Sequence, residues 1–248
     1  MGEQMKFFGI PVQFSFSSIF LLYISLSIGT GAITNQNADL ATIYTFCILG
    51  VTMLFGSLLF HERAHIFVAE RYGIECQKIE IFIVGAIAYM KSMPTTPLAN
   101  FNVAIAGPLM SFALAILLYT AAAILPLAPF HTSSLTTLVS RFTYFNFIIG
   151  FFNLLPIFPM DGGRILHSFL WWRKCDERKG RRSALHFSAD LTFLLAAIML
   201  IGGLLDILPS GLVFQTAIIA FLLIAMQKAE LQKLNTPPHD SDPTPTNT

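Results

Sequence analysis

Charged residues are scarce in this chain of 248 residues, where Asp, Glu, Lys and Arg together make up 12% of the sequence. A soluble domain of ordinary composition has about a quarter of its residues charged, so the scarcity argues against a protein surrounded by water on all sides. The net charge of +1 gives no reason to expect nucleic acid as a partner. Apolar residues make up 54% of the chain and the mean hydropathy is +0.66. Both values favour the lipid bilayer as the solvent.

Cysteine is also rare. Cys47, Cys76 and Cys175 lie far apart and form no C-x-x-C pair, so neither a thiolate zinc site nor a disulfide framework is indicated. We find no internal repeat and no second soluble segment, and we expect one membrane domain over residues 1–234. The remaining residues, 235–248, are rich in Pro, Thr and Asp and have almost nothing apolar to bury, which predicts a disordered tail.

Long apolar segments dominate the rest of the chain. A helix that crosses a bilayer needs roughly 20 mostly apolar residues, and the sequence predicts an all-α polytopic membrane protein with about six such helices. The candidate spans are Phe14–Ile33, Ala41–Ala69, Leu98–Leu125, Leu138–Leu170, His186–Leu205 and Gly211–Met226. The first could instead be a cleaved signal peptide, but its apolar run exceeds the roughly 7–15 residues of a signal core.

The basic residues are distributed asymmetrically. With the N-terminus inside, twelve of the fifteen Lys and Arg residues fall on the inner side, and only Arg141 borders an outer connection. Basic residues are retained on the cytoplasmic side. We therefore expect a multi-pass protein of the plasma membrane with both termini in the cytoplasm.

The second span contains the sequence Phe60-His61-Glu62-Arg63-Ala64-His65. At about 100° per residue, the two histidines lie about 40° apart on one helix face, where two imidazoles can hold one metal ion. Glu62 lies beside them and is placed to accept a proton from the attacking water rather than to ligate the metal. The alternative is a packed histidine pair with a surface glutamate. It would put three ionisable groups in an apolar span without a function, at a large energetic cost.

A catalytic zinc site usually has three protein ligands and one water. The fourth span supplies one candidate, Asp161, which is its only acidic residue. Pro156, Pro159, Gly162 and Gly163 surround it and would break the helix, and irregular backbone at membrane depth persists only against protein or a wet cavity. A simple proline kink is the alternative interpretation. We predict that Asp161 is the third ligand of a single Zn²⁺ ion.

These residues resemble the site-2 protease family of intramembrane zinc metalloproteases, in its compact six-span branch without a PDZ-like domain. The matching elements are His61-Glu62-x-x-His65, Arg71-Tyr72-Gly73-Ile74, Ile81-Phe82, Gly85-Ala86-Ile87-Ala88, Ala106-Gly107-Pro108 and Asn153-x-x-Pro156-x-x-Pro159-x-Asp161-Gly162-Gly163. The resemblance implies an endopeptidase that cleaves a transmembrane protein within the lipid bilayer. It assigns His61, His65 and Asp161 as metal ligands, Glu62 as general base and Asn153 as a substrate-positioning residue.

Two positions depart from the family pattern: Ala86 stands where relatives commonly have a second glycine, and Arg63 stands where they are usually apolar. Many relatives in this branch also carry a cytoplasmic CBS pair after the last span. The chain ends too soon to hold one, so the resemblance gives no support for nucleotide-type regulation.

Between the second and third spans, an isoleucine stands at every second position, at Ile79, Ile81 and Ile83, and Gly85 interrupts this period of two. This pattern predicts a short hairpin or bent strand. The resemblance implies that this segment, with Gly85 and Ala86, offers an edge to an extended substrate. A surface hairpin without such a role is the alternative.

Arg63 points about 200° away from His61 around the helix, and it should either pair with an acidic residue or extend its charged end toward the membrane surface. The candidates are Glu70 and Asp190. We favour Asp190, because two buried charges of opposite sign remove each other's desolvation cost.

Two other functions are compatible with intramembrane histidines and aspartate. A metal transporter would need no base at Glu62 and usually shows repeated halves. A catalytically silent protein that binds membrane clients would not need the intact set of base and ligands. Both fit the sequence less well than a protease.

Overall fold

The computed structural model describes residues 5–34, 37–82, 85–128, 132–205, 207 and 209–235. The chain divides into two compact units, Met1–Leu154 and Leu155–Thr248. Each unit is described separately. The predicted disordered tail lies outside the described residues except for Asn235, which ends the last helix.

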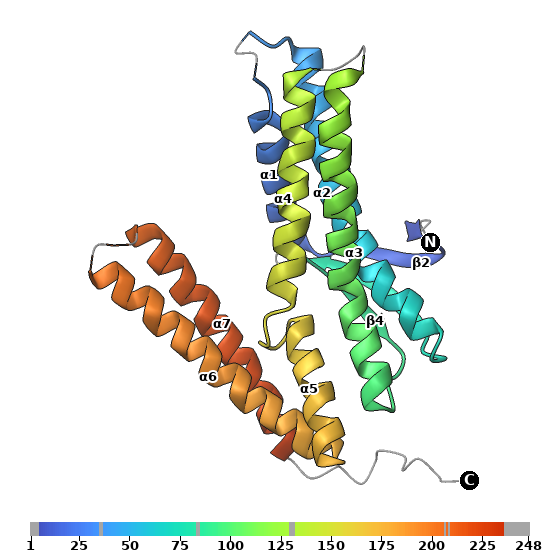
Figure 1. Ribbon diagram of the computed structural model, residues 1–248, viewed down its shortest axis with the longest axis vertical. Helices are drawn as coiled ribbons and strands as arrows, with labels where there is room; N and C mark the ends of the chain where they lie inside the picture. Colours follow the sequence, from blue (N-terminus) through green and yellow to red (C-terminus); the bar gives the residue numbers. More distant parts are fainter. Residues whose placement is uncertain are drawn as a thin grey trace. The chain divides into compact units, whose positions relative to one another are not determined.

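Four helices form most of the first unit: α1 (Ile19–Gly31), α2 (Leu40–Glu70), α3 (Pro97–Ile124) and α4 (Ser133–Asn153) (Figure 1). Short polar side chains mark where the helices begin. Asp39 accepts a hydrogen bond from the Thr42 N–H at the start of α2, and Thr96 accepts one from the Ala99 N–H at the start of α3. These side chains satisfy backbone donors that the first turn of a helix leaves without partners.

Two glycines allow α1 and α2 to touch backbone to backbone. A Cβ added at Gly29 would lie 2.3 Å from the Phe46 carbonyl oxygen, and one added at Gly50 would lie 2.5 Å from the Ser25 carbonyl oxygen. Small residues at such crossings are typical of helix packing in membranes, where close approach supplies dispersion energy. The two glycines therefore fix α1 against the helix that carries both histidines.

The first unit also contains a four-stranded sheet in the order β1-β2-β3-β4. The strands are β1 (Lys6–Phe7), β2 (Ile10–Phe14), β3 (Cys76–Phe82) and β4 (Gly85–Met90). The antiparallel pairing of β3 with β4 confirms the predicted hairpin, although Ile83 lies outside the described residues. The parallel pairing of β2 with β3 was not predicted. Ile79 and Ile81 of β3 are fully buried, and they join the sheet to the apolar core of the helices.

The second unit contains α5 (Asp161–Lys174), α6 (Glu177–Leu204) and α7 (Ser210–Asn235). Cys175, in the left-handed conformation, ends α5, and Asp176 caps α6 by accepting a hydrogen bond from the Lys179 N–H. A Cβ at Gly180 would lie 2.6 Å from the Trp171 nitrogen, so α5 and α6 pack closely at this point.

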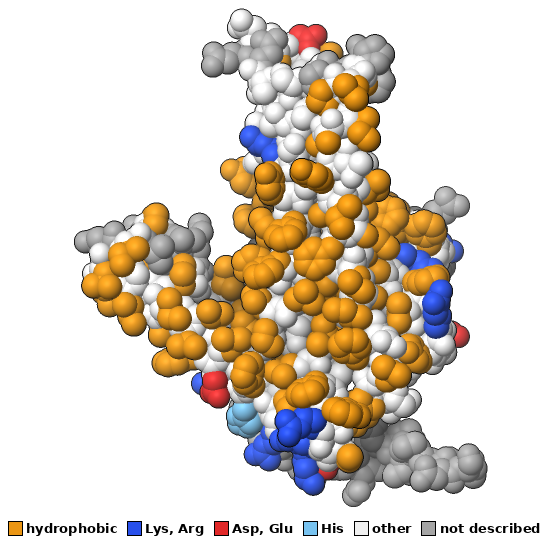
Figure 2. Space-filling view, viewed as in Figure 1, with side chains coloured by type: hydrophobic (Ala, Val, Ile, Leu, Met, Phe, Trp, Pro, Cys, Tyr) orange, Lys and Arg blue, Asp and Glu red, His pale blue; other side chains and the backbone are white. Residues whose placement is uncertain are grey.

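Four helices are long and apolar enough to cross a membrane by length and composition, among the residues described: Leu40–Glu70, Pro97–Leu127, Ser133–Asn153 and Glu177–Leu204. Hydrophobic side chains dominate the visible surface over α3 and α4 (Figure 2). A water-exposed surface would be more polar, so these observations support the predicted helical membrane protein. The count of six spans remains a prediction.

Two predicted spans differ in their bounds from the helices of the structure, and the predicted break in the fourth span is present. In the first predicted span, 14–33, Phe14 ends strand β2, Phe16–Ser18 form a short 3-10 helix, and the α-helix extends from Ile19 to Gly31. The fourth, 138–170, is two helices, α4 and α5, separated by residues 154–160. Pro156 and Pro159 lie in this separating segment, where they cannot continue the hydrogen-bonding ladder of a helix.

Candidate metal centre

His61 and His65 lie one turn apart on α2 and are buried, with 5% and 4% of their surface exposed. The Nδ1 atom of each ring has a partner on α3. His65 Nδ1 donates a hydrogen bond to the Val103 carbonyl oxygen over 2.7 Å, because a carbonyl can only accept. His61 Nδ1 lies 2.9 Å from the Ser111 hydroxyl, which can accept or donate. These partners fix both ring planes, as the outer partners of metal-binding histidines do.

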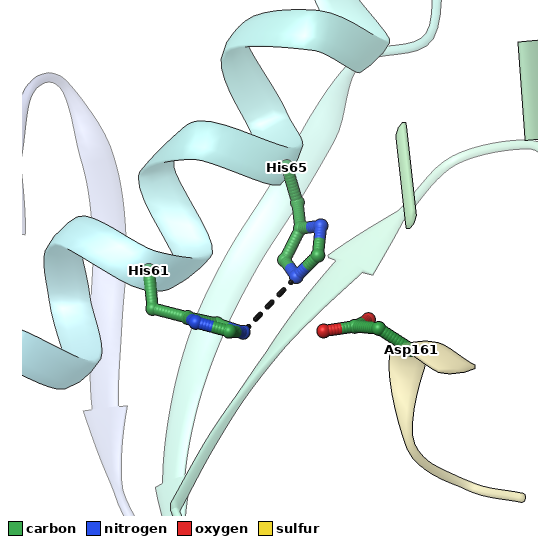
Figure 3. Close-up of side chains that lie close together, drawn as sticks. All are labelled: His61, His65 and Asp161. Carbon is green, nitrogen blue, oxygen red and sulfur yellow. Dashed lines mark hydrogen bonds between the residues drawn. The ribbon is translucent and has the colours of Figure 1, made fainter. Parts of the chain in front are cut away.

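The other nitrogens of the two rings face each other, with Nε2 of His65 3.2 Å from Nε2 of His61 (Figure 3). Since Nδ1 of His65 carries the proton, its Nε2 presents a lone pair. Two nitrogens bound to one tetrahedral zinc ion at 2.0–2.1 Å would lie about 3.3 Å apart. The observed separation therefore fits a shared metal ion. The Ser111 hydroxyl can accommodate either tautomer of His61.

Gly107 of α3 leaves open the space in front of the two Nε2 atoms. A Cβ at this position would lie 2.2 Å from His65 Nε2 and 2.6 Å from His61 Nε2. Any side chain here would occupy the place where an ion must approach the rings. Gly107 and Ser111 are four residues apart and so share one face of α3, which forms the wall opposite the histidines.

Asp161 is the first residue of α5 and has 8% of its surface exposed. Its carboxylate belongs to one group with the two histidines, in which the ligand atoms all lie within 4.8 Å of one another (Figure 3). One carboxylate oxygen and two imidazole nitrogens are a donor set that suits zinc. The three residues could therefore hold a metal ion.

Glu62 is not a member of this metal-binding group. Its Oε2 atom instead accepts a hydrogen bond of 3.0 Å from the Ala88 N–H of strand β4. The Glu62 carboxylate is thus directed toward the sheet, whereas His61 and His65 supply the ligand atoms of α2. This arrangement agrees with a residue that serves the site without ligating the metal.

The other residues predicted for the site lie in two places. Asn153 is the half-buried last residue of α4. Gly85 and Ala86 open strand β4, where they pair with Phe82 and Ile81 of β3. Their predicted contact with substrate stays a prediction.

The predicted partner of Arg63 was wrong. Arg63 Nη1 lies 3.1 Å from Glu70 Oε2, and the two residues form an ion pair along α2. The guanidinium also lies near the rings of Phe8 and Phe67, at 6.0 and 5.8 Å. The long side chains of Arg63 and Glu70 extend toward each other and so span two helical turns. The two aromatic rings further attract the guanidinium cation.

The roles of Gly107 and Ser111 were not predicted from the sequence. Their roles depend on how α3 packs against α2, which no local pattern reports. One signal was available: a serine four residues after a glycine in an otherwise apolar helix gives that helix one small, polar face.

The chain matches the model of peptidase family M50 over residues 49–132 and 122–199. It is 32% identical over 203 residues to the zinc metalloprotease MJ0392 of Methanocaldococcus jannaschii, covering 81% of this chain and 53% of that protein. It is also 32% identical over 218 residues to the putative zinc metalloprotease sll0528 of Synechocystis, covering 88% of this chain and 56% of that protein. The chain thus spans about half the length of these relatives.

Among solved structures, the fold is similar to that of a site-2 protease from Methanocaldococcus jannaschii. The TM-score is 0.59 and the sequence identity is 27%, over 97% of this chain and 98% of that one. The family match covers more than half of the residues, and it includes both histidines and the aspartate of the candidate metal centre. The apolar helices indicate a multi-pass membrane protein, and the chain belongs to peptidase family M50, the site-2 protease family.

Proposed function

We propose that this protein is an intramembrane zinc endopeptidase that cleaves transmembrane proteins. The observation that carries the proposal is the arrangement of the two imidazoles. Their Nδ1 atoms are bound to α3, their Nε2 atoms face each other at 3.2 Å, and Gly107 keeps the space before them open. Membership of a peptidase family and the zinc metalloproteases among the relatives agree with it.

We assign His61, His65 and Asp161 as the zinc ligands, and Glu62 as the general base. A bound zinc ion lowers the pKa of water to about 7 and polarises a carbonyl group. Glu62 accepts the proton of the attacking water and returns it to the leaving amine. The Ala88 N–H holds one of its carboxylate oxygens and so limits the rotation of the side chain.

The substrate binds as an extended segment along strand β4. Among the described strands, β4 is the last in the sheet order, next to β3 on one side only. A helical peptide hides its carbonyls in its own hydrogen bonds, whereas an added strand presents them. Gly85 and Ala86 of β4 and Asn153 of α4 position this segment.

Both termini lie in the cytoplasm and the membrane is the plasma membrane. The asymmetry of the Lys and Arg residues supports this orientation.

Metal analysis of the purified protein tests the ligand assignment. We expect about one zinc ion per chain in the wild type and in Glu62→Gln, because Glu62 is not a ligand. His61→Ala, His65→Ala and Asp161→Ala should each contain far less zinc. A normal zinc content in Asp161→Ala, or zinc loss in Glu62→Gln, would refute the assignment of roles.

A further inference from the structure

A glutamine is buried in the second unit. Gln227 of α7 has 1% of its surface exposed, although its amide must form hydrogen bonds to be tolerated in an apolar setting. Its Nε2 atom donates to the Phe158 carbonyl oxygen over 2.9 Å and to the Ser188 hydroxyl over 2.9 Å. Thr192 Oγ1 lies 3.3 Å away. The amide nitrogen, not the oxygen, must face Phe158, because a carbonyl can only accept.

Ser188 of α6 also binds the backbone of Phe158. The Phe158 N–H donates a hydrogen bond of 2.7 Å to the Ser188 hydroxyl. Both backbone polar groups of Phe158 are therefore bound by side chains, one from α6 and one from α7. We call Gln227 and Ser188 the Phe158 clamp.

Phe158 lies three residues before Asp161, in the irregular segment that leads into α5. The first turn of α5 packs directly on it: a Cβ at Gly163 would lie 2.8 Å from the Phe158 nitrogen and 3.0 Å from its Cγ. Met160, the N-cap residue that precedes this helix, makes no side-chain capping bond. The entry into α5 is thus fixed by the clamp and by the Gly163 contact, not by an ordinary helix cap.

We infer that Gln227 and Ser188 are positioning residues for the Asp161 carboxylate. A ligand must hold its distance to a metal ion within about 0.2 Å, and Asp161 sits on the turn that packs on the clamped backbone. If the clamp is lost, the backbone of Phe158 can move, and the first turn of α5, which contains Asp161, can shift with it. The inference rests on the proposed function, since it takes Asp161 as a zinc ligand.

The test compares zinc affinity among purified full-length variants in detergent, by competition with a chromophoric chelator. Gln227→Met removes all the donated bonds at similar size, and Ser188→Ala is a milder change that removes one hydroxyl. Thr192→Val is the matched control, because Thr192 accepts a hydrogen bond from Gln227 but makes none to Phe158. We expect about tenfold weaker zinc binding in the first two variants and wild-type affinity in the control. Ser188→Thr, which keeps the hydroxyl, should recover the affinity.

Two further readouts separate positioning from folding. The visible spectrum of the Co²⁺-loaded protein reports ligand geometry, and it should change in Gln227→Met and Ser188→Ala but not in Thr192→Val. Asp161→Asn tests the underlying assignment: if it binds zinc as tightly as the wild type, the proposed ligand set fails. If Asp161→Asn loses zinc while Ser188→Ala keeps both the wild-type affinity and the wild-type Co²⁺ spectrum, the clamp is overturned.

Discussion

The substitution Gly107→Ala offers a sharp test of the metal centre, because it adds one methyl group at a known place. The new Cβ would lie 2.2 Å from His65 Nε2 and 2.6 Å from His61 Nε2. Ordinary contact begins at 3.4 Å, so the rings must withdraw by about 1.2 and 0.8 Å. Metal–ligand distances tolerate only about 0.2 Å. The displacement exceeds that tolerance several-fold for both imidazoles.

We expect Gly107→Ala to weaken zinc binding by at least about a hundredfold, the upper end for changes in the surroundings of a metal site. This factor corresponds to about 2.7 kcal/mol of binding free energy. The fold should survive, because the atoms met are the ends of side chains, and alanine favours a helix over glycine by about 1 kcal/mol.

Gly56→Ala is the matched control for this prediction. Gly56 lies on α2, the helix of the histidines, and a Cβ there would meet nothing within 4 Å. Zinc affinity by chelator competition and the unfolding temperature of the metal-free protein should both be measured. Normal zinc affinity in Gly107→Ala would refute the placement of the metal before the two Nε2 atoms. Equal loss of zinc in Gly56→Ala would show that the effect is not local.

Three further predictions concern the ion pair, the helix crossing and the topology. A double-mutant cycle of Arg63→Leu and Glu70→Leu should give a coupling of only about 0.2–1 kcal/mol in the free energy of unfolding, because the side chains are 23% and 44% exposed; a coupling of several kcal/mol would contradict this picture. Gly50→Ala should destabilise the fold by about 1–3 kcal/mol, since its Cβ would lie 2.5 Å from a backbone oxygen; unchanged unfolding would disprove the close crossing. Exposed Cys175, with the other two cysteines changed to serine, should resist an impermeant thiol reagent in intact cells and react after lysis; labelling before lysis would reverse the proposed orientation.

The histidine pair of the candidate site could be predicted from the sequence, because the two residues are close along one helix. A spacing of four residues fixes their common face wherever the helix packs. Asp161 could be predicted for a different reason. A single acidic residue in an interrupted apolar segment is energetically costly, and such residues usually have a function. Gly107 and Gln227 could not be assigned roles in this way, since their partners lie in other helices.

The errors have equally local causes. Strand β2 (Ile10–Phe14) was not predicted, because it is only five residues long and its partner β3 begins more than sixty residues later. For Arg63, Asp190 was favoured on the assumption that the charge is buried, whereas the side chains of Arg63 and Glu70 are 23% and 44% exposed. Two long flexible side chains can span two turns, and this removed the need for a partner on another helix.

The central claim, that this chain is a protease acting within the membrane, is tested most directly by mapping new protein N-termini. Membrane fractions of cells producing the wild type would be compared with those of cells producing equal amounts of Glu62→Gln. We predict N-termini that lie inside transmembrane segments of other proteins, present with the wild type and absent with Glu62→Gln. Identical sets of intramembrane N-termini in the two samples, with both proteins folded and loaded with zinc, would contradict the proposed activity.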